Sequence, residues 1–252
     1  MSKPHVFLAL PSYVNGPDSW RIAVAATLDA TDGTCEVFRS VAEGSLLANV
    51  FNSLWCDALN SRENDRLTHF AMLHSDVCPE PGWLDILVRE QEGTGADVLS
   101  VVIPIKDGRG VTSTAVDNPD NPWEPLRRIT LREAYQLPET FNADDAGHPG
   151  HRLLVNTGCW ICRLDRPWCE NVLFTVQDRI SQSYAGRFSP QVISEDWNFS
   201  RQVQDAGGRV LATRKVRVIH RGVASYANDR PWGTWERDEA YNVRPERELL
   251  AA

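Results

Sequence analysis

The sequence predicts an α/β protein in which helices flank a mixed, mostly parallel sheet, all within a single domain. Its 252 residues lie at the upper end of what one domain holds. Hydrophobic residues make up 42% and charged residues 24%, as is typical of a folded globular chain. Short apolar runs of strand length alternate with longer amphipathic segments, which is the pattern of an α/β sheet.

The first half of the chain supplies most of these elements. Residues 6–10 form a continuous apolar run that ends at Pro11, and this predicts a buried first strand. Apolar residues recur at helical spacing over residues 43–60, which predicts an amphipathic helix. We expect further strands at residues 70–73 and 98–105, and a helix between them that begins after the turn at residues 79–82.

The second half is less regular. Residues 117–150 are rich in Pro, Asn and Asp, so we expect an irregular excursion near the site, with one helix over residues 126–137. A strand is expected at residues 153–164, a helix at 194–206 closed by two glycines, and a strand at 216–219. Cys159 and Cys162 lie in the apolar strand pattern, so we interpret them as buried packing residues.

Charge and hydropathy restrict the partners. The net charge of −8 argues against non-specific binding of nucleic acid, which depends on neutralising phosphates. Residues 201–221 contain six basic residues and one acidic residue. This excess of positive charge suits a small anionic ligand, although solvated surface charge explains it as well. No apolar run approaches the roughly 18 residues of a membrane span. The first residues do not resemble a signal peptide, so we expect a cytoplasmic protein.

Two polar groups follow predicted strands. His74, Ser75 and Asp76 come directly after the strand at residues 70–73, where open α/β sheets collect their ligands. An Asp there can hold Mg²⁺ or Mn²⁺, but a polar turn that caps the next helix is the plainer alternative. His220 ends the strand at 216–219 and could also ligate a metal, although a lone His is more often structural.

Glu195 and Asp196 open the helix that follows Ser194. Serine is a preferred N-cap and acids favour the first helical turn, so this motif has a structural explanation. The functional alternative is a carboxylate that acts as general base. The chain has no G-x-G-x-x-G after its first strand, no P-loop and no G-x-S-x-G, which makes dinucleotide, P-loop and serine-hydrolase chemistry improbable.

Taken together, the segments resemble the GT-A glycosyltransferases, specifically their family-2-like branch. The match extends over residues 5–222, and its order and spacing carry the resemblance. His74 stands where the family has the first Asp of its D-x-D motif, which implies an altered donor or metal preference. The matching segments are residues 11–15, 67–76, 79–84, 156–160, 194–199, 206–208 and 220–222.

The resemblance implies a Rossmann-like GT-A fold and a metal-dependent hexosyl- or pentosyltransferase. The donor would be a nucleotide-diphosphate sugar, with a UDP-sugar expected, and a single displacement would invert the anomeric centre. Residues 1–105 would bind the donor, residues 106–222 would form the acceptor and catalytic half, and residues 223–252 a tail. The acceptor stays open; a modified nucleic-acid base is among the candidates, although the net charge disfavours it. A degenerate domain that binds a nucleotide sugar without turnover and a nucleotidyltransferase are the alternatives.

The resemblance also assigns roles to residues. Mn²⁺ or Mg²⁺ would be held by Asp76 and His220 with His74, and Asp196 would be the base, with Glu195 as the second choice. The donor would contact Pro11, Tyr13, Asn15, Ser75 and Arg221. On the acceptor side the resemblance places Trp160, Gly158, Trp232 and Trp235.

Overall fold

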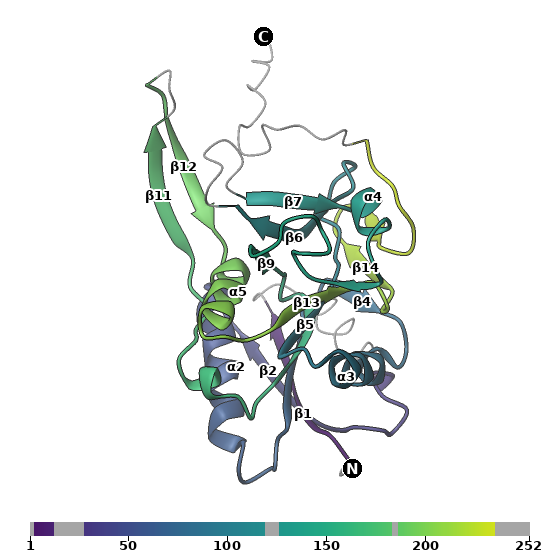
Figure 1. Cartoon of the computed structure of the whole chain (residues 1–252). Helices are drawn as coiled ribbons and strands as arrows, with labels where there is room; N and C mark the ends of the chain where they lie inside the picture. Colours follow the sequence, from purple (N-terminus) through teal and green to yellow (C-terminus); the bar gives the residue numbers. More distant parts are fainter. Residues whose placement is uncertain (1–2, 13–27, 119–125, 183–185, 235–252) are drawn as a thin grey trace.

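A seven-stranded mixed sheet forms the centre of the computed structural model, which describes residues 3–12, 28–118, 126–182 and 186–234 (Figure 1). Five of its strands run in one direction, and β10 and β8 run opposite to them. The predicted fold class, a mostly parallel sheet flanked by helices, is confirmed. In spatial order the strands are β2 (Glu36–Glu43), β1 (His5–Ser12), β3 (His69–Leu73), β10 (Cys159–Arg163), β5 (Val98–Val101), β13 (Val210–Thr213) and β8 (Thr140–Phe141).

Helices cover both faces of this sheet. The helices α2 (Leu47–Ser61) and α5 (Glu195–Asp205) lie on one face, and α3 (Trp83–Thr94) lies on the other (Figure 1). Successive residues of a strand point to opposite faces, so Phe70 and Met72 pack with α2 while Ala71 and Leu73 pack with α3. The central strands are therefore buried on both sides, which explains their continuous apolar runs.

Smaller sheets complete the fold. One joins β4 (Val77–Pro79), β14 (Val218–Arg221) and β15 (Ser225–Ala227), and another joins β6 (Val111–Asp117), β7 (Leu126–Thr130) and β9 (Arg152–Leu154). Val116, Ile129 and Leu153 of the second belong to the same apolar cluster as Phe70 of the central sheet. This small sheet therefore shares the apolar core that lies on the α2 face of the central sheet.

The β11–β12 hairpin, made of β11 (Gln177–Gln182) and β12 (Phe188–Ile193), projects from the rest of the chain (Figure 1). Within the part of the chain that the structure describes, its strands pair only with each other. Ile180 is 78% exposed and Phe188 is 74% exposed, so part of its apolar surface is open to solvent. The sequence analysis did not predict this hairpin.

The structure corrects the expectation of a helix over residues 126–137. Residues 126–130 form β7, which pairs with β6, and only the short α4 (Leu131–Ala134) is helical. The boundary lies at Thr130, because its hydroxyl accepts a bond from the Glu133 amide while the Glu133 carboxylate accepts one from the Thr130 amide. This capping box begins a helix, so the residues before it are free to pair as a strand.

The strand expected at residues 153–164 is also divided. β9 joins the small sheet and β10 enters the central one, while residues 155–158 cross between them. Asn156 fixes the crossing, since its side chain donates to the Val101 carbonyl and accepts from the Gly158 amide.

Other sequence predictions are confirmed. Cys159 and Cys162 are buried in the core, and all six cysteines are free thiols. Burial raises the pKa of the Cys159 thiol well above its ordinary value, so this side chain is unreactive. The short 3-10 helix η1 (Pro167–Glu170) follows β10.

Among the described residues, no helix has the length and apolar character that crossing a membrane requires.

Candidate active site

The candidate site lies where β3 ends and turns into β4. The Val77 amide donates to the His74 carbonyl at 3.1 Å, which closes the turn, and the His74 amide donates to the Gly158 carbonyl at 2.8 Å. β4 then pairs with β14 so that Val77 lies opposite His220. This pairing joins two motifs that are about 145 residues apart in the sequence, and it gives the turn a fixed neighbour.

Two side chains meet the carboxylate of Asp76. The Nε2 atom of His220 lies 3.5 Å from Asp76 Oδ2, and the ammonium of Lys106 forms an ion pair with the same oxygen. Burial by itself raises the pKa of Asp76, but the contacts with His220 and Lys106 outweigh it and hold the pKa well below its ordinary value. Asp76 is therefore an anion throughout the physiological pH range.

A backbone carbonyl orients His220. Its Nδ1 atom lies 2.8 Å from the carbonyl oxygen of Pro104. A carbonyl oxygen only accepts, so Nδ1 carries the proton of this bond, and Nε2 is the ring nitrogen that faces Asp76. Metal-binding histidines are commonly fixed in this way by a bond from their second nitrogen.

His74 lies in a less polar environment. Its ring is 5.0 Å from that of Phe51, and its Nε2 atom is buried without a hydrogen-bond partner among the described residues. Burial lowers the pKa of His74 to about 4, although the Asp76 charge acts in the opposite direction. His74 is consequently a neutral imidazole at physiological pH, with an unused buried nitrogen.

These residues fit a divalent ion only in part. Among the residues that the structure describes, no group of three His, Cys, Asp or Glu side chains is arranged to hold a metal. Asp76 and His220 form a pair of donors with a fixed histidine, and Mg²⁺ needs only one or two protein carboxylates when substrate phosphates supply the remaining ligands. The pair therefore suits an ion that arrives with a diphosphate.

Lys106 was missed by the sequence analysis. It is the first residue after the apolar segment 98–105, so the reasoning that selected His74 and Asp76 applies to it equally. The Lys106 side chain lies along the backbone of Gly222, where an added Cβ would be 3.0 Å from its Cδ atom. Gly222 thus leaves room for the lysine to reach Asp76.

Asp196, near the start of α5, is a second candidate group. Its Oδ1 atom accepts hydrogen bonds from the Ser194 hydroxyl and from the Trp197 amide, the latter at 2.8 Å. Burial raises the pKa of Asp196 from 3.8 to about 6, helped by the nearby charge of Glu195 and opposed by the Ser194 bond. A carboxylate with a pKa near 6 suits general-base catalysis.

The segment from residue 103 to residue 113 contacts His220, which faces Asp76, and Trp197, which follows Asp196. Its Pro104 carbonyl binds His220, and its Ser113 carbonyl accepts a hydrogen bond from Trp197 Nε1 at 3.0 Å. The two ends of this segment are joined to each other, because the Ser113 amide donates to the Ile103 carbonyl at 2.9 Å. Asp76 and Asp196 therefore lie on elements that share one structural support.

The structure describes three of the five residues that were expected to bind the donor. Pro11 is buried at the end of β1, opposite Ala42 of β2. Ser75 lies in the turn between His74 and Asp76, half-buried. The Arg221 amide donates to the Asp76 carbonyl at 2.8 Å, and its exposed side chain contacts Cys78 Sγ at 3.1 Å. Tyr13 and Asn15 lie outside the described residues.

The acceptor-side expectations need one correction. Trp160 has no exposed surface and packs among Trp55, Phe70 and Phe199. A fully buried ring cannot stack on a sugar, so the expected role of Trp160 is wrong. Gly158 is buried as well.

The described part of the tail packs against the molecule. Trp232 is half-buried, lies 6.0 Å from the Tyr226 ring, and donates from Nε1 to the Ala227 carbonyl at 2.6 Å. Trp235 lies outside the described residues.

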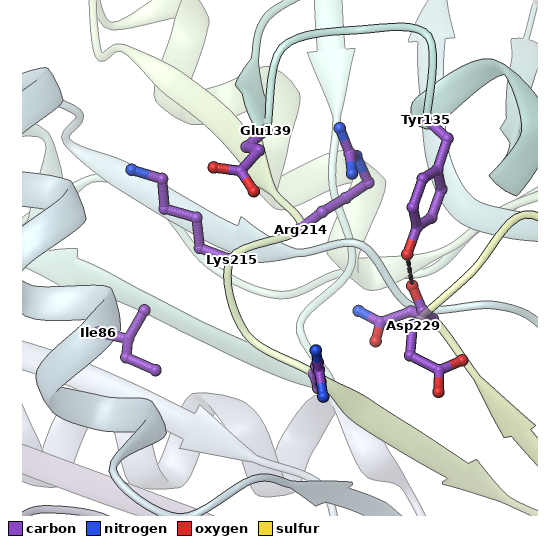
Figure 2. A pocket seen from close by; sticks show the side chains of 8 residues that line it. Ile86, Tyr135, Glu139, Arg214, Lys215 and Asp229 are labelled. Atoms are coloured by element: carbon purple, nitrogen blue, oxygen red, sulfur yellow. Dashed lines mark hydrogen bonds between the residues drawn. The ribbon is translucent and has the colours of Figure 1, made fainter.

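The basic stretch between residues 201 and 221 does not form one face. Arg201 binds Asp117, and Lys215 binds Glu90 at 2.5 Å. Three of its members line a separate cavity of about 450 Å³, where the Arg214 guanidinium lies 4.4 Å from the centre of the Tyr135 ring (Figure 2). The cavity is lined by Ile86, Tyr135, Glu139, Arg214, Lys215, Arg217, Asn228 and Asp229.

No protein-family model matches this chain, and no curated protein does. Solved structures that are similar to it over most of their length include the following two. The crystal structure of A197 from STIV has a TM-score of 0.44 and 12% identity, covering 92% of this chain and 95% of that one. CMP:2-keto-3-deoxy-manno-octonic acid synthetase complexed with CTP has a TM-score of 0.41 and 10% identity, covering 82% and 88%. Similarities of this size do not by themselves indicate a shared function.

Proposed function

We propose that the chain is a glycosyltransferase that moves a sugar from a nucleotide-diphosphate sugar to an acceptor hydroxyl. The observation that carries the proposal is the pair formed by Asp76 and His220, whose Oδ2 and Nε2 atoms are 3.5 Å apart at the carboxyl end of a central strand. Open α/β sheets bind nucleotides at this edge. The bond from His220 to Pro104 fixes the ring before any ligand arrives.

Asp76 and His220 would hold Mn²⁺ or Mg²⁺, with the buried nitrogen of His74 as a further donor. A bound divalent ion supplies Lewis-acid stabilisation of the charge that develops on the leaving nucleotide diphosphate. Arg221 follows His220 on the same strand, and its exposed guanidinium adds positive charge for the same phosphates.

Asp196 is proposed as the general base. Both of the hydrogen bonds that described residues donate to it use Oδ1, so Oδ2 is the atom that would accept the proton of the acceptor hydroxyl. The hydroxyl oxygen then forms a bond with the anomeric carbon while the bond to the diphosphate oxygen breaks, and the electron pair leaves with the diphosphate. A single displacement of this kind inverts the anomeric centre.

The first test is a thermal-shift screen of UDP-sugars with and without MnCl₂, followed by an assay of UDP release with a panel of hydroxyl acceptors. A donor at about 100 times its dissociation constant should raise the free energy of unfolding by about 2.7 kcal/mol. Metal-dependent stabilisation together with UDP release supports the proposal. Stabilisation without UDP release for any acceptor would instead support a domain that only binds. Release of pyrophosphate from CTP or UTP with a sugar phosphate would support a nucleotidyltransferase.

A further inference from the structure

Lys106 occupies the place beside Asp76 that a divalent ion would need. Its ammonium contacts Oδ2, the same oxygen that faces His220 Nε2 at 3.5 Å. Two cations that share one carboxylate oxygen repel each other, so the ion and the ammonium exclude each other there.

The position of Lys106 is built into the fold. The lysine stem lies against Gly222, which directly follows β14, and an added Cβ at that glycine would be 3.0 Å from Cδ and 3.4 Å from Cβ and Cγ of the lysine. The following residues are also fixed, because the Asp107 carboxylate accepts bonds from the amide and the guanidinium of Arg109. The backbone on both sides of the ion pair is therefore held.

The ion pair is on the open side of the site. The side chains of Lys106 and Asp76 are 36% and 38% exposed, so an arriving ligand can reach the ammonium. A diphosphate offers oxygen acceptors with negative charge, and an ammonium that leaves a carboxylate can move to them.

We infer that Lys106 is a built-in competitor of the divalent ion, which makes the binding of the ion conditional on the nucleotide diphosphate. Without nucleotide, the ammonium neutralises Asp76 and the ion binds weakly. With nucleotide, the ammonium of Lys106 moves from Asp76 to the oxygens of the diphosphate. The Asp76 carboxylate is then available to the ion. The two ligands then bind cooperatively, and each raises the affinity of the other by the same factor. This inference rests on the proposed metal and nucleotide site.

The test measures Mn²⁺ affinity by electron paramagnetic resonance, with and without UDP, in the wild type and in Lys106→Met. Methionine keeps an unbranched stem and removes the charge. Without UDP, the variant should bind Mn²⁺ about 5- to 150-fold more tightly than the wild type, the usual range of such couplings. Addition of UDP should tighten Mn²⁺ binding in the wild type and have a much smaller effect in the variant.

Two further variants locate the effect. Lys215→Met removes a lysine that pairs with Glu90 outside the site, and it should leave Mn²⁺ affinity as in the wild type. Asp76→Asn in the Lys106→Met background should abolish the gain. Unchanged or weaker Mn²⁺ binding in Lys106→Met, or equal enhancement by UDP in both proteins, would overturn the inference. The measurement without UDP needs no donor and no acceptor, so a failure to find sugar transfer would count against the proposed function alone.

Discussion

The imidazole of His220 lies between the Pro104 carbonyl, 2.8 Å from Nδ1, and the Asp76 carboxylate, 3.5 Å from Nε2. One ring nitrogen is thus committed to the backbone and the other is presented to the site. Substitutions that imitate one nitrogen at a time can separate these two functions.

His220→Asn and His220→Gln form such a pair. The amide of Asn occupies roughly the place of Nδ1 and can keep the bond to Pro104, whereas the amide of Gln reaches the place of Nε2. If Nε2 ligates the ion, His220→Asn should lose about 10- to 100-fold in Mn²⁺ affinity and His220→Gln should lose less. Calorimetric titration with MnCl₂ in the presence of UDP measures both. An equal loss in the two variants would mean that His220 only supports the turn.

Asp76→Asn should remove metal-dependent donor binding and leave the protein folded. The side chain is partly exposed in a turn, and the amide is a poorer ligand than the carboxylate for a hard cation. Thermal shift should therefore show most of the stabilisation by UDP and Mn²⁺ disappear, about 2.7 kcal/mol at saturating ligand. Asp165→Asn is the control, since it removes another partly exposed aspartate from an ion pair, with Arg163. Retention of the Mn²⁺ effect in Asp76→Asn would exclude this residue as a ligand.

Asp196→Asn should keep donor affinity and lower the transfer rate by about 10²–10⁴, because a positioned base contributes that much. Glu195→Gln changes the neighbouring carboxylate and serves as the comparison. If Asp196 is only an acid of the first helical turn, its replacement should cost about 0.3–1 kcal/mol of stability and spare turnover. Full activity in both variants would reopen a mechanism that retains the anomeric configuration and needs no base here.

The transfer rate should also depend on pH through Asp196. The base acts when it is deprotonated, and its pKa is raised from 3.8 to about 6, so the rate should rise up to about pH 6 and then level off. The Ser194 hydroxyl bond lowers this pKa, so Ser194→Ala should move the rise to higher pH. Ser194 makes no capping bond with its side chain, and the helix should lose little from the change. A profile in Ser194→Ala that coincides with the wild type would contradict the assignment.

Gly110→Ala should destabilise the fold more than Gly147→Ala. Both glycines have positive φ, +74° and +82°. An alanine in this left-handed conformation destabilises the fold by about 1–2 kcal/mol. At Gly110, however, the added Cβ would lie 2.0 Å from the Trp232 carbonyl oxygen, while at Gly147 it would meet nothing within 4 Å. The difference in the free energy of unfolding between the variants, measured with urea, reports how firmly residues 225–234 are packed. Equal losses would show that this contact adds nothing.

The buried elements could be predicted from the sequence, because an apolar run or a helical spacing reflects burial directly. This applies to β1, β3, α2, α3 and α5. The edge strand β2 was missed, since exposed and half-buried residues alternate along it without an apolar run. The helix expected over residues 126–137 was wrong although the sequence contains the capping box of Thr130 and Glu133, which would have set the correct start.

The site was predictable to the extent that it follows strand ends. That principle selected Asp76 and His220, which the structure brings together, and it would also have selected Lys106. It could not reveal the Pro104 carbonyl, because a backbone contact leaves no mark in the residue type. Trp160 was misassigned because a tryptophan in a strand is equally compatible with a core and with a binding face, and only packing decides between them.

The place of β10 has a consequence for synthesis of the chain. This strand lies between β3 and β5, yet it follows both of them in sequence by more than 50 residues. The ribosome must therefore synthesise the chain as far as residue 163 of 252 before β3 and β5 can pair with β10, the strand that lies between them. Until then one edge of β3 and both edges of β5 are unpaired, because the other neighbour of β5, β13, follows later still, and pairing at such sequence separation is slow. Unpaired strand edges expose the nascent chain to aggregation at this stage, and a truncation before β10 would make that state permanent.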